Sequence, residues 1–110
     1  MVCHCKTCRR VSGGLAGAWV SVAAEAFAIT QGKPKRYASS KGVQRQFCGA
    51  CGTQLNYARA GEPDFLDVAT TTLDDPDAFP PTHHSWLSHD LAWVKFGDGL
   101  PTFRKSRGDG

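Results

Sequence analysis

Two short cysteine clusters constrain the fold of this chain more than any other feature of its sequence. Cys3, Cys5 and Cys8 form a C-x-C-x-x-C run near the start, and Cys48 and Cys51 form a C-x-x-C pair interleaved with glycines. Two cysteines separated by two residues can hold one metal ion from a single tight turn, and zinc favours thiolate ligands in a tetrahedral arrangement. The spacing therefore predicts a small domain that folds around bound zinc.

The cysteine count argues against a disulfide framework. The chain has 110 residues and five cysteines, and an odd number cannot pair completely within one chain. Its start, MVCHCKTCRR, carries cysteines and charges where a secretory signal would be apolar, so we expect a reducing, cytoplasmic environment. The longest apolar stretch, residues 15–20, is far shorter than the roughly 20 residues of a membrane-spanning helix, so no membrane partner is expected.

Charge is distributed unevenly along the chain. Basic residues gather in residues 1–45 and acidic residues in residues 46–94. One interpretation is a pair of oppositely charged, solvated faces. The other is that Lys6, Arg9 and Arg10, next to the first cysteine cluster, offset thiolate charge and attract an anionic ligand. The basic half lacks the interleaved aromatic residues of a nucleic-acid groove, so a nucleic-acid partner is not expected.

Short apolar runs bounded by turn residues predict a mainly β fold built from short antiparallel strands. We expect one domain over residues 1–103, followed by a flexible basic tail at residues 104–110. One short helical turn is expected over Leu73–Asp77, because Asp74 can cap it and Pro76 suits its first turn. The predicted strands are Ala18–Val22, Phe27–Thr30, Lys35–Ser39, Val43–Phe47, Gln54–Ala58, Phe65–Thr70 and Trp93–Phe96.

The five cysteines permit two arrangements of metal ligands. In the first, Cys5, Cys8, Cys48 and Cys51 close one four-thiolate site and leave Cys3 as a spare ligand or thiol. In the second, Cys3, Cys5 and Cys8 form an open site whose fourth position takes water or substrate, as catalytic zinc sites do. The later pair would then be half of a closed site. A redox couple is a further interpretation of C-x-x-C, but the βαβ context in which it normally occurs is missing.

Histidines and tryptophans are the other candidates for a functional role. His4 lies between two candidate ligands, and alternation should direct its side chain away from the metal, so we expect it at the surface. His83 and His84 are expected as hydrogen-bonded loop residues, with a proton shuttle or substitute zinc ligand as the second interpretation. His89 is expected at the surface. The tryptophans expected in the core are Trp19, Trp86 and Trp93.

Four segments carry a resemblance to a known family. They are CHCKTCRR at residues 3–10, FCGACGTQL at residues 47–55, TLDDP at residues 72–76 and PTHHSW at residues 81–86. With these motifs, the chain resembles the glutathione-dependent formaldehyde-activating enzyme family, which also includes centromere protein V. The similarity runs from residue 1 to about residue 103, which is nearly the whole chain.

The resemblance implies a β-rich, tent-like fold around zinc, of the kind found in the Mss4 exchange chaperone. Cys3, Cys5 and Cys8 resemble the open site at which the glutathione thiolate binds, and Cys48 and Cys51 resemble half of a structural site. In the family the other half is a C-x-C on an upstream strand, which this sequence does not contain. A strand edge left uncovered in this way would be free to pair with a second copy, which puts a homodimer among the expected partners.

The resemblance also implies a carbon–sulfur lyase-type activity. Its substrates would be glutathione and formaldehyde, joined or separated as S-hydroxymethylglutathione, or a related thiol and aldehyde. Arg9 and Arg10 would hold a glutathione carboxylate, or would simply form a solvated, charged turn. The alternative is a zinc-stapled binding module of the same fold without catalysis.

Overall fold

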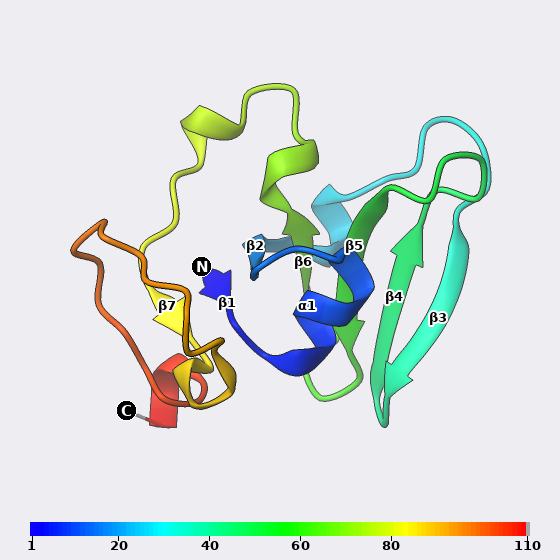
Figure 1. Cartoon of the computed structure of the whole chain (residues 1–110). Coiled ribbons are helices and arrows are strands. Elements are labelled where there is room, and N and C mark those ends of the chain that lie inside the picture. The colour runs from blue at the N-terminus through cyan, green and yellow to red at the C-terminus, as the bar shows by residue number, and fades with distance from the viewer. Residues whose placement is uncertain (110) are drawn as a thin grey trace. The chain divides into compact units, whose positions relative to one another are not determined.

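The computed structural model describes residues 1–109 and shows a chain that is mainly β (Figure 1). Both antiparallel and parallel strand pairs occur. The elements in chain order are β1 (Val2–Cys3), α1 (Lys6–Ser12), β2 (Gly17–Ala23), η1 (Ala24–Ala26), β3 (Lys35–Ser40), β4 (Val43–Phe47), β5 (Gln54–Arg59), β6 (Phe65–Ala69), η2 (Thr70–Thr72), η3 (Pro76–Ala78), β7 (His84–Ser85), η4 (Leu87–His89) and η5 (Arg107–Asp109).

The predicted mainly β class is confirmed, since seven strands accompany one short α-helix over residues 1–109. None of the helices in this range has the length and apolar character required to cross a membrane. The chain separates into two compact units. The first combines Met1–Trp19 with the chain from Asp77 onward, and the second is Val20–Pro76.

The second unit contains an antiparallel meander in which β3 pairs with β4, β4 with β5 and β5 with β6. Cross-strand side-chain pairs support it, because facing residues on one sheet surface lie within contact distance. The Arg45 guanidinium lies 4.8 Å from the centre of the Tyr57 ring, and the Asn56 amide donates a hydrogen bond of 2.9 Å to Gln46 Oε1. The register shifts after Gln46, where β4 ends and the chain enters the turn that carries Cys48.

The first unit is organised around β1, a strand of two residues with a partner on each side. It pairs antiparallel with β2, where Cys3 lies opposite Gly17, and parallel with β7, where Cys3 lies opposite Ser85. A side chain at Gly17 would not fit, because a Cβ atom there would lie 2.7 Å from Trp19 Nε1 and 3.3 Å from Cys8 Cβ. The glycine therefore allows Trp19 and Cys8 to pack closely beside β1.

Five of the seven predicted strands are confirmed to within about a residue, as β2 to β6. The prediction for Phe27–Thr30 is wrong, since these residues are irregular, and so is that for Trp93–Phe96, a segment of turn and loop. A helical turn is found as η3, but it begins three residues later than expected, at Pro76, and Leu73–Asp75 are not helical. The sequence did not indicate β1, α1 or β7.

Part of the segment expected to form a flexible tail has backbone partners. The Ser88 N–H donates a hydrogen bond of 3.0 Å to the Arg104 carbonyl, and the Trp86 N–H donates one of 3.0 Å to the Lys105 carbonyl. Trp86 itself has a positive φ of 61°, a left-handed conformation that turns the chain from β7 into η4. Gly110, the last residue of the predicted tail, lies outside the described residues.

Candidate metal centre

Cys3, Cys5 and Cys8 converge in the first unit, and we refer to them as the cysteine cluster. A search of the described residues for three or more potential metal ligands close together finds this group, and its sulfur atoms all lie within 4.8 Å of one another. Cys3 ends β1, Cys5 precedes α1 and Cys8 lies in its first half. Cys3 and Cys8 are buried and Cys5 is half-buried. One side of the cluster is therefore enclosed by protein, and solvent reaches it at Cys5.

Helix capping explains why so short a segment brings three sulfurs together. Cys5 is the N-cap of α1, and its sulfur accepts a hydrogen bond of 3.3 Å from the Cys8 N–H. The sulfur thus takes the place that a serine or aspartate oxygen normally has at an N-cap. The helix ends at Gly13, whose φ of 68° is the left-handed conformation that glycine adopts readily. The single helical turn from Cys5 to Cys8 returns the two side chains to the same side.

The three sulfur atoms share protons unequally. Hydrogen bonds from the Cys3 and Cys8 thiols hold the pKa of Cys5 well below its ordinary value. The pKa of Cys3 is raised, because its thiol is held by side-chain hydrogen bonds to Cys5 and to Cys8 and because it is buried. Near neutral pH the metal-free cluster therefore carries its negative charge on Cys5, with the other two thiols as donors.

The donor set fits a zinc ion. Three thiolates at about 2.3 Å from a tetrahedral zinc ion would lie about 3.8 Å apart, and the cysteine cluster already holds its sulfur atoms within 4.8 Å. A small contraction of the side chains would complete the contacts. Three ligands leave one of the four tetrahedral positions open, which is the arrangement of catalytic zinc sites.

Metal affinity at the cluster is expected to rise steeply with pH. Because the Cys3 and Cys8 thiols donate hydrogen bonds to Cys5 and keep their protons in the metal-free state, binding of a metal to three thiolates releases two protons. The affinity should then increase about 100-fold per pH unit between pH 6 and 8. Cobalt titrations at several pH values measure this slope directly. An increase in affinity of tenfold or less per pH unit would show that fewer than two of the cysteines are protonated in the metal-free protein over this pH range.

The second cysteine pair, in the other unit, forms a tight turn. The Cys48 N–H donates to the Thr53 carbonyl and the Gly52 N–H to the Cys48 carbonyl, both at 2.8 Å. Gly52 has a φ of 80°, a left-handed conformation that glycine adopts without strain. Cys51 is exposed, and a hydrogen bond from the Thr53 hydroxyl, 3.0 Å from its sulfur, lowers its pKa. Cys48 and Cys51 thus offer two sulfur ligands at the surface of their unit.

The two arginines proposed to bind an anion lie next to each other in the last part of α1. Arg9 is half-buried, and its Nη2 donates a hydrogen bond of 3.2 Å to the His89 carbonyl. Its Nε is buried without a hydrogen-bond partner among the described residues. Arg10 is exposed. The Arg9 side chain is therefore fixed by one hydrogen bond and keeps one N–H unpaired in the described part of the chain, whereas the Arg10 side chain is exposed to solvent.

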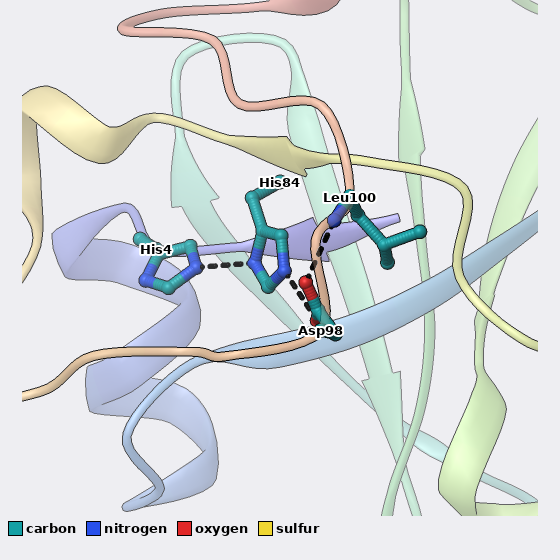
Figure 2. A network of polar contacts seen from close by, with 4 residues as sticks. All are labelled: His4, His84, Asp98 and Leu100. Atoms are coloured by element: carbon teal, nitrogen blue, oxygen red, sulfur yellow. Dashed lines mark hydrogen bonds and ion pairs between the residues drawn. The ribbon is translucent and has the colours of Figure 1, made fainter.

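The expected position of His4 is wrong. His4 does not join the cysteine ligands, but its ring is enclosed by protein, with the centre of the Phe96 ring 5.0 Å away. His4 is 2% exposed, and its Nε2 lies 2.9 Å from His84 Nδ1. His84 Nε2 in turn lies 2.7 Å from Asp98 Oδ2 (Figure 2). Asp98 is a residue that the sequence reasoning missed.

The other histidines and the tryptophans show mixed outcomes. His83 is hydrogen-bonded as expected, since Thr82 Oγ1 lies 2.9 Å from its Nδ1. His89 is only half-buried, and its ring lies 5.0 Å from the Trp86 ring. Trp19 is buried as expected, whereas Trp93 is 72% exposed and does not belong to the core. Neither His83 nor His84 joins the metal-ligand group found among the described residues.

Comparison with known families matches residues 1–89 to the model of the glutathione-dependent formaldehyde-activating enzyme family. The match covers most of the chain, and the chain belongs to this family. Its strand-rich structure is consistent with the Mss4-like fold that the sequence resemblance implied. A comparison with curated proteins produced no match.

Proposed function

We propose that this protein is a zinc-dependent enzyme of the carbon–sulfur lyase type that acts on glutathione and formaldehyde at the cysteine cluster. The observation that carries the proposal is the convergence of three sulfur ligands, one fewer than a closed tetrahedral site requires, in a member of this family. Bound zinc would supply Lewis acidity, which favours the deprotonated form of a thiol at the open position.

The reaction requires little acid–base machinery. The glutathione sulfur loses its proton and bonds to the carbonyl carbon of formaldehyde, while the carbonyl oxygen gains a proton, so that S-hydroxymethylglutathione forms without any oxidant or reductant. The reverse reaction breaks the same carbon–sulfur bond. The main contribution of the protein is to hold the two reactants together, which replaces a bimolecular encounter by a local one.

The residues around the cluster support this role. Burial of Cys3 and Cys8 excludes water from one side, and the half-buried Cys5 marks the side from which a small thiol can approach. Arg9, whose guanidinium is held by the His89 carbonyl, places a positive charge in the helix that carries Cys8, which suits a glutathione carboxylate. Exposed Arg10 would add a second, mobile positive charge. Five unbridged cysteines are in keeping with a reducing compartment such as the cytoplasm.

Zinc-loaded protein is expected to bind glutathione saturably and to bind S-methylglutathione at least tenfold more weakly, because the methylated sulfur cannot become a thiolate. Calorimetry measures both affinities, and carbon-13 NMR with labelled formaldehyde measures formation of the adduct. Metal-free protein is the matched control and should lose the preference for the free thiol. If fully zinc-loaded protein does not bind glutathione, the proposed function is wrong and the non-catalytic binding module becomes the better interpretation.

A further inference from the structure

We propose that His84 and Asp98 are positioning residues for the metal centre, which hold the His4 ring and thereby fix the segment that carries the cysteine ligands. The three side chains form a continuous chain of hydrogen bonds that begins between two of the ligands and ends on a distant loop. We call it the His4–His84–Asp98 chain. The inference depends on metal binding at the cysteine cluster and does not depend on which thiol or aldehyde reacts there.

The chain joins three segments that are far apart in the sequence. His4 follows β1, His84 begins β7 and Asp98 belongs to the loop before the last segment (Figure 2). The distances are 2.9 Å from His4 Nε2 to His84 Nδ1 and 2.7 Å from His84 Nε2 to Asp98 Oδ2. The second carboxylate oxygen, Asp98 Oδ1, accepts a hydrogen bond of 3.0 Å from the Leu100 N–H. Both oxygens of the carboxylate are thus fixed.

The ionised carboxylate determines where the ring protons lie. Hydrogen bonds from the Leu100 N–H and from His84 lower the pKa of Asp98, so its side chain is an acceptor only. His84 must therefore carry a proton on Nε2, and in its neutral form it presents an unprotonated Nδ1 to His4. His4 Nε2, 2.9 Å from that nitrogen, then donates the hydrogen bond, and one tautomer is selected at each ring.

Burial makes this arrangement rigid. His4 and His84 are each 2% exposed, and a buried ring nitrogen without a hydrogen-bond partner is destabilising. The Phe96 ring packs against both, with ring centres 5.0 Å from His4 and 4.9 Å from His84. Phe96 and Asp98 come from the same loop, so this loop holds the histidine pair by a ring contact and by a hydrogen bond. Rotation of either ring would break at least one of these contacts.

The backbone passes this rigidity to the ligands. The His4 N–H donates to the Ser85 carbonyl at 3.0 Å, and the His84 N–H donates to the Pro101 carbonyl at 2.8 Å. His4 therefore has its backbone and its side chain bound to the same neighbouring strand. Because Cys3 and Cys5 are its direct neighbours, a fixed His4 limits the backbone conformations open to both ligands. Partners outside the ligand shell of metal sites commonly contribute 10- to 100-fold to affinity in this way.

The test uses cobalt as a probe, because cobalt–thiolate absorption reports both affinity and ligand geometry. Asp98→Ala is expected to weaken cobalt binding at the cysteine cluster about 10- to 100-fold and to alter the spectrum of the bound ion. Asp98→Asn should have a smaller effect in the same direction, since its single amide oxygen can replace only one of the two accepted hydrogen bonds. This milder variant decides the question if Asp98→Ala does not fold.

Two control variants separate positioning from general stability. Asp77→Asn removes an exposed negative charge of the same unit and should leave cobalt affinity unchanged. Phe103→Leu replaces a ring whose centre lies 5.7 Å from that of His83 by a smaller aliphatic side chain. It should lower the free energy of unfolding but weaken cobalt binding less than Asp98→Ala does. The proposal is wrong if Asp98→Ala and Phe103→Leu, compared at matched loss of unfolding free energy, weaken cobalt binding equally.

Nitrogen-15 NMR of the histidine rings gives a second readout that does not need metal. In the unaltered metal-free protein, His4 and His84 should both carry their proton on Nε2. Asp98→Ala should leave His84 as a mixture of tautomers while the backbone spectrum of residues 20–76 is preserved. A folded Asp98→Ala variant with an unchanged His84 tautomer and cobalt affinity within twofold of the original would overturn the proposal.

Discussion

Cys3→Ser is expected to weaken cobalt and zinc binding at the cysteine cluster by more than the roughly 10- to 100-fold expected for an outer partner of the site. A serine hydroxyl stays protonated at neutral pH and is a poor replacement for a thiolate ligand. The large effect is expected because the Cys3 sulfur lies within 4.8 Å of the Cys5 and Cys8 sulfurs and can bind the same metal ion. The measurement is a cobalt titration followed by competition with zinc.

Cys51→Ser is the matched control, since it makes the same chemical change in the other unit. It should leave the cobalt affinity of the cysteine cluster within about twofold of the original. The competing arrangement, in which Cys5 and Cys8 combine with Cys48 and Cys51, predicts the reverse. In that case Cys51→Ser would abolish the site and Cys3→Ser would have little effect.

Removal of the metal is expected to destabilise the first unit selectively. Metal present at 1,000 times its dissociation constant adds about 4 kcal/mol to the free energy of unfolding, a large share of the 5–15 kcal/mol typical of a protein. Its ligands lie at the end of β1 and around the start of α1. Hydrogen exchange after chelation should therefore accelerate in β1, α1 and β7, and much less in β3 to β5.

The control for this experiment is a Cys3→Ser, Cys5→Ser, Cys8→Ser variant, in which the chelator should have no effect on exchange in β1 and α1. Equal acceleration in β3 to β5 and in β1 would contradict the prediction, because it would place the stabilising metal outside the cysteine cluster. Thermal unfolding of the same samples gives the overall loss of stability. A difference of less than 1 kcal/mol between metal-loaded and metal-free protein would also contradict it.

The strands of the meander could be predicted because their information is local. Residues 35–59 contain short runs of strand formers separated by glycine-containing turns, and β3, β4 and β5 follow this pattern. β1 and β7 have two residues each and no period of their own. They exist because Val2 pairs with His84, a partner at the other end of the chain. No local pattern can indicate such a pairing.

The helix was missed for a related reason. The α1 sequence, KTCRRVS, has no apolar stripe, and its cap is a cysteine rather than one of the residues that normally mark a helix start. The opposite error occurred at Trp93–Phe96, where an apolar run suggested a strand. In the structure Phe96 covers the two histidine rings and Trp93 is exposed. The apolar run in this segment therefore reflects a loop that packs on polar side chains and not a strand.

The metal centre itself was accessible from sequence because its three ligands lie in residues 3–8, so spacing alone could group them. Their surroundings were not accessible. Alternation placed His4 at the surface, whereas its ring is buried because Phe96, from a loop far along the chain, packs against it. Asp98 lies in a glycine-rich loop with no motif, and its role depends entirely on the position of His84.

The parallel pairing of β1 with β7 has a consequence for the order in which the protein can be assembled. The second unit, Val20–Pro76, is one uninterrupted stretch, and its strands meet neighbours that have already left the ribosome. The first unit needs both ends, because β1 obtains its parallel partner only after residues 84 and 85 have been made. During synthesis the cysteine ligands emerge about 80 residues before the strand that pairs with β1. Until that strand has been made, the thiols of a growing chain are exposed to metal and to oxidants.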